Sequence, residues 1–495
     1  MKQVHLVYTA NDRNIPHFPE SSLSLAAVLL AAGFDARITD TAISPQPEWR
    51  FDDPLLLGLT VYSNESISTA IDIARQCRLD HPGVPIVWGG PHAQMVPEQT
   101  AAHPLADAVC YGEGEGPIVE MARQLAAGRW DPEAISGLMY KGPDGSVRKT
   151  RSVPPIDLDA LPYSPYHLLR LDRYFISSHK CYYQSSRGCP FSCTFCCDIQ
   201  QRRWRPRSAP TVLRHLERIV SEFRSREIYF SDANFFVDIR RAEAICRGLV
   251  DRDLGIRWSA FCRADTVMRM KDDFLALLAR AGCSQLDIGG ESGSDQVLAR
   301  FSKGTTRETL LRAVDRLVRV GIRPELSFIT GAPIEAPEDL TSTMSLIDTL
   351  RQDFPLATVN GLFHYQPYPN SSLGKETIER WQLPLPTCLE DWPKRPLSAP
   401  RREYFPWLDH RQFNRMVVVN AIANYRYFYH RMMDSAEIDV LQRSLPWRFL
   451  RLAARVAQAT FVRWLVYLRW NMGVNAFPIE WRIYSWLRDR LVRAA

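Results

Sequence analysis

Three closely spaced cysteines constrain this chain more than any other feature. Cys189, Cys193 and Cys196 follow a C-x3-C-x2-C pattern in the stretch RGCPFSCTFC at residues 187–196. Thiolates at such spacing can surround one soft metal centre from a single loop. Three ligands on a cluster of four irons leave one iron open for a small molecule. The loop therefore predicts an iron–sulfur cluster with an open coordination position.

Two other readings of the loop stay open on spacing alone, a zinc knuckle and three unrelated buried cysteines. Zinc usually takes a fourth Cys or His close by. The next histidine, His215, falls well downstream in an expected helix, and adjacent Cys197 would form a strained chelate. Both are poor fourth ligands, so the cluster is the favoured reading.

The loop resembles the signature of radical S-adenosylmethionine enzymes. In that family an aromatic residue often precedes the third cysteine, and Phe195 takes this place. The resemblance implies a [4Fe–4S] cluster held by Cys189, Cys193 and Cys196. It also implies that the open iron binds the amino acid end of S-adenosylmethionine.

Composition indicates a cytoplasmic globular protein of two or three domains. The 495 residues are 46% hydrophobic and 23% charged, and the net charge of +6 does not by itself indicate nucleic acid binding. Eleven cysteines, an odd number without a small-scaffold pattern, favour a reducing compartment. We expect no signal peptide and no membrane-spanning helix, since no apolar run of about 18 residues occurs.

The first region alternates expected strands with expected helices, which predicts an open parallel sheet of the Rossmann-like (flavodoxin-like) type. Ligands of such sheets lie beyond the carboxyl ends of the strands. Small or polar residues follow three strands, at 60–63, 89–93 and 112–114, although ordinary turns also have this composition. The expected strands are 4–9, 34–39, 55–61, 85–88 and 108–111, and the expected helices are 21–32, 67–79 and 117–125.

The two glycine turns resemble those of the cobalamin-binding domain that precedes many radical S-adenosylmethionine domains. The D-x-H-x-x-G cobalt-ligating motif of other cobalamin proteins is absent, and residues 11–17 do not match it. We therefore expect no histidine ligand from that position, and we expect His92 to contact the cofactor periphery or cap a turn. The cobalamin-binding residues implied by the resemblance are Thr60, Ser63, Gly89, Gly90, His92, Gly112, Glu113 and Gly114.

A Pro- and Gly-rich stretch from residue 141 predicts a β-turn and an extended linker. Beyond it, six expected strands alternate with helices, a (βα)6 pattern that predicts a partial TIM-like barrel with its reactive face at the strand carboxyl ends. The expected strands are 181–186, 227–231, 257–261, 285–288, 325–330 and 358–364, and the helices between them are 210–225, 240–251, 271–281, 307–320 and 340–351.

Polar residues follow most of these barrel strands. Strand-end polar residues often only cap helices, but several in register around a cysteine loop favour a ligand site. By resemblance, Ser231 and Asp232 lie near the methionine moiety and Glu291 near the ribose. The full set implied for S-adenosylmethionine is Phe195, Ser231, Asp232, Asn234, Arg263, Glu291 and Ser292.

The last region is aromatic and basic, with ten Arg and two acidic residues from residue 441 onward. It predicts a helical cap on the barrel, or an amphipathic helix at 445–470 that meets anionic lipid at the inner membrane face; nucleic acid is not expected. The expected domains are 1–140 for cobalamin, 141–175 as linker, 176–384 for the barrel and 385–495 for the helical part.

The resemblance implies the reaction. We expect methylation of an unactivated sp3 carbon of a lipid, tetrapyrrole, peptide or natural-product precursor, through a 5′-deoxyadenosyl radical and methylcobalamin. The alternatives are a cobalamin-assisted cyclisation, ring contraction or oxidation without methyl transfer, and a non-catalytic cobalamin-binding regulator. A flavodoxin or ferredoxin is the expected electron donor. The sequence does not indicate a catalytic side chain.

Overall fold

The computed structural model describes residues 3–9, 18–44, 49–178, 180–197, 203–223, 225–394, 400–420 and 423. The chain divides into two compact units. Most of the expected C-terminal helical region, including the interfacial helix at 445–470, lies outside the described residues. Unit 1 comprises 1–190, 197–258 and 384–399, and unit 2 comprises 191–196, 259–383 and 400–495.

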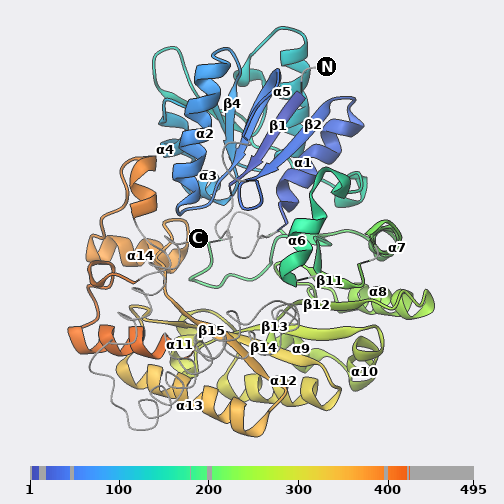
Figure 1. Ribbon diagram of the computed structural model, residues 1–495. Coiled ribbons are helices and arrows are strands. Elements are labelled where there is room, and N and C mark those ends of the chain that lie inside the picture. The colour runs from blue at the N-terminus through green and yellow to red at the C-terminus, as the bar shows by residue number, and fades with distance from the viewer. Residues whose placement is uncertain are drawn as a thin grey trace, which may run out of the picture. The chain divides into compact units, whose positions relative to one another are not determined.

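A seven-stranded sheet in unit 1 has the strand order β2-β1-β3-β4-β5-β6-β7 (Figure 1). Its first five strands are parallel and its last two antiparallel. The order reverses between β1 and β3, and ligands of open α/β sheets bind where such a reversal occurs. The strands are β1 (Gln3–Tyr8), β2 (Asp35–Asp40), β3 (Pro54–Thr60), β4 (Ile86–Gly89), β5 (Ala108–Cys110), β6 (Leu138–Lys141) and β7 (Val147–Lys149).

Helices cover both faces of this sheet. Side chains that alternate along β1 point to opposite faces: Val7 packs with residues of α2 (Ser66–Asp80), and Leu6 with residues of α1 (Glu20–Ala31) and α5 (Glu115–Ala126). This doubly wound arrangement confirms the expected Rossmann-like fold. Two short helices, α3 (Pro91–Met95) and α4 (Pro97–Ala102), follow β4 and were not expected.

The stretch expected to begin the linker instead completes the sheet. Gly142 and Ser146 close a tight turn through a 2.8 Å backbone hydrogen bond, and Gly145 adopts a φ of +80° that favours glycine. The turn joins β6 and β7 as a hairpin, so the first sheet continues past the boundary expected at residue 140.

A second sheet has six strands in the order β15-β14-β13-β12-β11-β8, which confirms the expected (βα)6 pattern. Its described pairings are parallel. The strands are β8 (Lys180–Tyr183), β11 (Glu227–Phe230), β12 (Arg257–Cys262), β13 (Cys283–Glu291), β14 (Arg323–Thr330) and β15 (Thr358–His364). The helices are α6 (Leu171–Ser178), α7 (Ala209–Phe223), α8 (Ile239–Asp251), α9 (Ala264–Arg269), α10 (Asp272–Arg280), α11 (Asp295–Arg300), α12 (Arg307–Arg319), α13 (Pro337–Asp353) and α14 (Ser372–Trp381).

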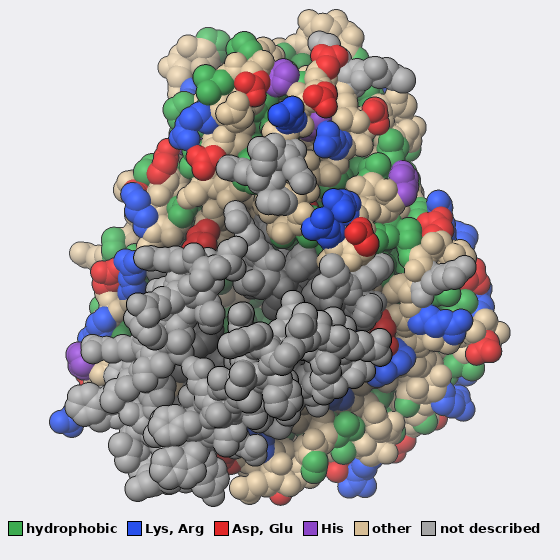
Figure 2. Space-filling view, viewed as in Figure 1, with side chains coloured by type: hydrophobic (Ala, Val, Ile, Leu, Met, Phe, Trp, Pro, Cys, Tyr) green, Lys and Arg blue, Asp and Glu red, His purple; other side chains and the backbone are tan. Residues whose placement is uncertain are grey.

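The surface of the described residues carries charges of both signs, interspersed over the face seen in Figure 2. None of the helices in the described ranges is both long enough and apolar enough to cross a bilayer.

Candidate functional site

A glycine-lined pocket of about 210 Å³ lies in unit 1 at the carboxyl ends of β3, β4 and β5. Its deeper wall is apolar, with Leu6, Leu56, Ile118 and Met121 among the lining residues. Six of the eight residues expected to bind cobalamin line this pocket: Thr60, Gly89, Gly90, Gly112, Glu113 and Gly114. The fold therefore brings together residues that lie more than 50 positions apart in the sequence.

The glycines keep side chains out of this pocket. Gly90 has a φ of +89°, and a Cβ atom there would lie 2.9 Å from both Thr60 Cγ2 and Val61 N. At Gly112 a Cβ atom would meet nothing within 4 Å. Gly58, which the sequence reasoning missed, also lines the pocket from within β3. A glycine cradle with an apolar wall fits a large, flat cofactor such as cobalamin.

Ser63 and His92 are not among the residues that line the pocket. His92 Nδ1 lies 2.9 Å from Ser63 Oγ, and its ring meets the ring of Trp392 edge-on with the centroids 5.0 Å apart. His92 is fully buried, and this burial lowers its pKa to about 4. The two residues therefore pair with each other inside unit 1, and the imidazole is neutral at pH 7.

An ion cluster joins one edge of the pocket to the strand before the cysteine loop. The Arg187 guanidinium donates to Glu113 Oε1 at 3.0 Å and to Glu115 Oε1 at 2.6 Å. Arg205 donates to both Glu113 oxygens at 2.8 Å. Burial alone would raise the pKa of Glu113, but the hydrogen bonds from Arg205 and Ile156 and the charge of Arg187 hold it below its ordinary value. Glu113 thus stays ionised, and both of its carboxylate oxygens accept hydrogen bonds from arginines.

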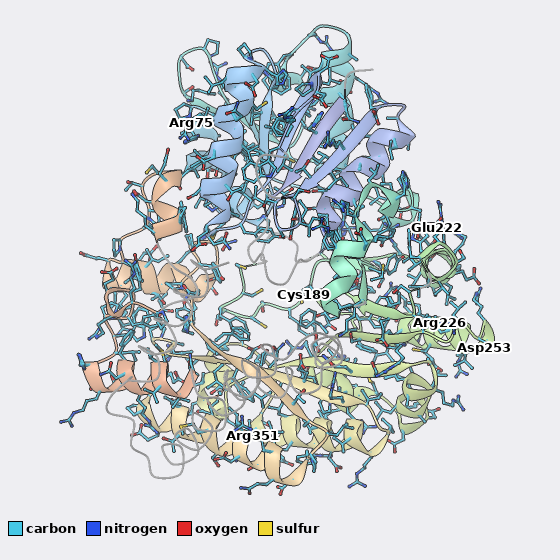
Figure 3. All side chains as sticks on the ribbon, viewed as in Figure 1. Arg75, Cys189, Glu222, Arg226, Asp253 and Arg351 are labelled. Atoms are coloured by element: carbon cyan, nitrogen blue, oxygen red, sulfur yellow. The ribbon has the colours of Figure 1, made fainter. Side chains whose placement is uncertain are left out.

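Cys189, labelled in Figure 3, lies two residues after the end of β9 (Ser186–Arg187). Its side chain is half-buried. Cys193 and Cys196 belong to unit 2, where Cys196 N donates to Cys193 O at 3.2 Å. Across the described part of the chain, no three side chains of His, Cys, Asp or Glu form a group arranged to hold a metal. The assignment of these three cysteines to a cluster therefore rests on their spacing and on the family resemblance.

Backbone and aromatic contacts fix the cysteine loop within unit 2. Thr194 N donates to Phe301 O at 3.0 Å, and Thr194 O accepts from Leu373 N at 2.9 Å. The Phe195 ring meets the Phe301 ring edge-on at 4.8 Å and packs against a small apolar cluster that includes Tyr365. Phe195, expected in the cofactor site, thus also anchors the loop.

Arg263 brings a positive charge to the same loop. Its Nη1 lies 3.8 Å from Cys193 Sγ, and its guanidinium lies 3.8 Å from the centroid of the Phe191 ring. Asp265 and the Lys303 carbonyl oxygen hold the other guanidinium nitrogens. Cysteine thiolates are the ligands that hold iron–sulfur clusters. The donor set of the loop therefore fits an iron–sulfur cluster.

The expected S-adenosylmethionine residues of unit 1 follow β11. Ser231 Oγ donates to Glu20 Oε1 at 2.7 Å. Asp232 is fully buried and accepts hydrogen bonds of 2.6–2.7 Å from Ser185 and Ser186. Burial raises its pKa above the ordinary value despite the nearby charge of Arg241. Asp232 therefore organises the chain that leads into the cysteine loop.

Asn234, the third expected residue after β11, accepts a hydrogen bond from Phe236 N at 3.1 Å. Its Nδ2 atom is buried without a hydrogen-bond partner among the described residues. Such an unpaired donor is costly unless a ligand or water accepts from it, so Asn234 is suited to meet a bound molecule.

The expected residues after β13 lie in a tightly built turn of unit 2. Glu291 is buried, has a φ of +59° and accepts a 2.6 Å hydrogen bond from Lys303 Nζ. Ser292 Oγ accepts from Ser294 N at 3.1 Å and lies 3.3 Å from Thr343 Oγ1. Lys303 was not expected, because a lysine twelve residues after Glu291 follows no local periodicity. Strained backbone at Glu291 is typical of ligand sites.

Two protein-family models match the chain, the B12 binding domain over residues 16–122 and the Radical SAM superfamily over residues 183–347. An uncharacterized methyltransferase of Pyrococcus horikoshii is 31% identical over 331 residues, which cover 66% of this chain and 70% of the relative. The anaerobic magnesium-protoporphyrin IX monomethyl ester cyclase of Rubrivivax gelatinosus is 29% identical over 61% of this chain and 55% of its own length.

Among solved structures, the cobalamin-dependent S-adenosylmethionine radical enzyme OxsB, determined with aqua-cobalamin and S-adenosylmethionine bound, superimposes with a TM-score of 0.70. The match covers 99% of this chain and 75% of OxsB at 19% sequence identity. At that identity the likeness establishes the fold.

Proposed function

Since the chain belongs to the cobalamin-binding radical S-adenosylmethionine enzymes, we propose that it transfers a methyl group to an unactivated sp3 carbon of a small or lipid-like molecule. The observation that carries this proposal is the glycine-lined pocket of unit 1. A radical enzyme that also holds cobalamin has a carrier for a methyl group, whereas the cluster and S-adenosylmethionine alone supply hydrogen abstraction.

The cofactors of this family are a [4Fe–4S] cluster, S-adenosylmethionine and cobalamin, and together they supply radical abstraction and methyl transfer. The protein's task is to hold and orient them. Cys189, Cys193 and Cys196 are proposed as the cluster ligands, and Arg263 contacts Cys193 Sγ through its guanidinium. The pocket glycines leave room for cobalamin, and the apolar side chains of the wall offer it a hydrophobic contact surface.

S-adenosylmethionine is proposed to contact the strand-end residues. Asn234 offers an amide donor that no group in the described ranges engages, and Glu291 offers a carboxylate oriented by Lys303. Asp232 and Ser292 act indirectly, because their polar atoms are already engaged by Ser185, Ser186 and Ser294. Phe195 is proposed to pack beside the cofactor while it anchors the loop.

Product analysis tests this proposal. Protein reconstituted without oxygen, loaded with cobalamin and reduced by flavodoxin or ferredoxin is incubated with S-adenosylmethionine and a small-molecule extract that supplies the acceptor, whose consumption is followed. Methyl transfer predicts both 5′-deoxyadenosine and S-adenosylhomocysteine. If only 5′-deoxyadenosine forms over the full time course, methyl transfer is wrong.

A second candidate is a cobalamin-assisted ring closure or oxidation without methyl transfer. The observation that favours it is the similarity to the Rubrivivax gelatinosus cyclase. The same product analysis separates the two reactions, because this candidate predicts 5′-deoxyadenosine alone. Peripheral membrane contact through the basic C-terminal region stays a prediction that vesicle co-sedimentation would test.

A further inference from the structure

A second pocket, in unit 2, is lined by a partly buried glutamate that has one buried carboxyl oxygen without a described partner. The pocket lies beside the turn that follows β14 and is about 210 Å³ in volume. Glu335 Oε2 accepts a hydrogen bond from Gly331 N at 2.5 Å. Glu335 Oε1 is buried and has no hydrogen-bond partner among the described residues. An unpaired buried oxygen of this kind costs stability unless a ligand meets it.

Two arginines line the same pocket from residues 410–420, which are helical. Arg415 is fixed by hydrogen bonds to Pro337 O and Thr341 Oγ1 at the start of α13. Arg411 is exposed and makes no hydrogen bond or ion pair within the described ranges. The guanidinium of Arg411 is therefore available to a ligand, and guanidinium groups select carboxylates and phosphates.

The turn itself is shaped for this arrangement. Gly331 has a φ of +76°, and a Cβ atom there would lie 2.1 Å from Met416 Sδ. Trp407 Nε1 donates to Gly331 O at 2.9 Å. Gly331 is thus engaged through both its N–H and its carbonyl oxygen. Because the turn follows a parallel strand, the pocket lies at the sheet edge where ligands of such folds bind.

We propose that this pocket binds an oxyanion, the carboxylate or phosphate group of a small molecule, between Arg411, Arg415 and the unpaired oxygen of Glu335. That the oxyanion belongs to the substrate rests on the function proposed above. Oxyanion binding itself does not, because it requires neither the cluster nor S-adenosylmethionine.

The protonation state of Glu335 supports this assignment. Burial raises its pKa to about 8, the charge of Asp339 on α13 adds to the rise, and Gly331 N–H and Arg415 oppose it. Since Oε2 accepts from Gly331, the acid proton resides on Oε1 and is donated to the ligand. Above pH 8 the ionised carboxylate repels an anion, so affinity falls by up to about tenfold per pH unit.

Isothermal titration of the full chain with acetate or methyl phosphate, at constant ionic strength and without reductant or S-adenosylmethionine, tests the proposal. The acetate arm is repeated from pH 6.5 to 9.5 (roughly 1.5 units on either side of the Glu335 pKa). Tighter binding of acetate identifies a carboxylate as the natural group, and tighter binding of methyl phosphate identifies a phosphate.

Three variants test whether Arg411 and Glu335 are the groups that bind the anion. Arg411→Met is expected to weaken binding at least about tenfold. Glu335→Gln keeps a donor at the same place and is expected to bind with an affinity that no longer changes with pH. Arg280→Met removes an exposed arginine of α10 and should bind like the unmodified protein. No binding of either probe, or unchanged affinity in Arg411→Met, overturns the site even if methyl transfer is demonstrated.

Discussion

Arg187 Nη2 lies 2.6 Å from Glu115 Oε1, and both side chains are almost fully enclosed, at 12% and 6% exposure. Glu115 begins α5 and lines the glycine-lined pocket, and Arg187 lies two residues before Cys189. This ion pair ties the turn after β5 to the segment that leads into the cysteine loop. The link lies wholly within unit 1.

Replacing Arg187 by Met should destabilise unit 1 by about 3 kcal/mol, because Glu115 would be left buried without its cation, whereas Glu113 keeps Arg205. We expect a lower thermal midpoint and less cobalamin retained after gel filtration. Arg252→Met, which removes an exposed pair with Glu217, should cost less than about 1 kcal/mol. Partial recovery in the double variant Arg187→Met/Glu115→Gln would identify the unpaired carboxylate as the cause, and no recovery would argue against it.

Cys193→Ala should lose most of the reconstituted iron and all cleavage of S-adenosylmethionine, because two thiolates hold a four-iron cluster poorly. Iron content, the charge-transfer absorption of the cluster and 5′-deoxyadenosine formation are measured together. Cys197→Ala, which removes an exposed neighbouring cysteine outside the C-x3-C-x2-C pattern, should keep all three. Full cleavage by Cys193→Ala would refute the cluster assignment.

Gly112→Leu should abolish cobalamin binding without unfolding the protein. A Cβ atom at Gly112 meets no neighbour, so the added side chain projects into open space rather than into the core. Gly116→Leu is the matched control, because Gly116 is equally unobstructed but does not line the pocket. Bound cobalamin is read from the absorption spectrum and folding from the thermal midpoint. Normal cobalamin content in Gly112→Leu would place the cofactor elsewhere.

His92 should make the protein sensitive to acid. Burial lowers its pKa from 6.5 to about 4, so between these values the folded state binds fewer protons than the unfolded state. The contribution of neutral His92 to the free energy of unfolding is fully present above pH 6.5. It is lost as the pH falls toward 4, and the loss amounts to about 3 kcal/mol. His92→Gln should show a smaller drop in thermal midpoint between pH 7 and pH 5, while exposed His167→Gln should behave like the unmodified protein.

The expected strands and helices of the described ranges appear with bounds shifted by no more than three residues, and β15 coincides with its expected range. Apolar runs and glycines are local features of the sequence, so these strands and helices can be predicted from the sequence alone. The β6–β7 hairpin was missed because its short strands carry Arg148 and Lys149 and resemble a charged linker. The pairing with β5 that makes them strands is a tertiary contact.

The candidate site divides in the same way. Cys189, Cys193 and Cys196 and the glycine turns are local patterns, and local spacing is sufficient to recognise them. Arg187, Lys303 and Glu335 gave no local signal. Each is placed in a site by a hydrogen bond that only the folded chain forms: Arg187 with Glu113, Lys303 with Glu291, and Glu335 with Gly331. These partners lie 74, 12 and four residues away in the chain.

The sequence by itself determined the two-part α/β architecture, the cysteine loop and the glycine turns, because periodicity and short spacing act over a few residues. Only the tertiary structure decided which buried polar groups have hydrogen-bond partners within the protein and which do not. Glu113 and Asp232 are hydrogen-bonded to internal partners, whereas Asn234 Nδ2 and Glu335 Oε1 are buried and have no partner in the part of the chain that the structure describes. The reason is physical: the free energy of a buried polar group depends on the partners that folding brings to it.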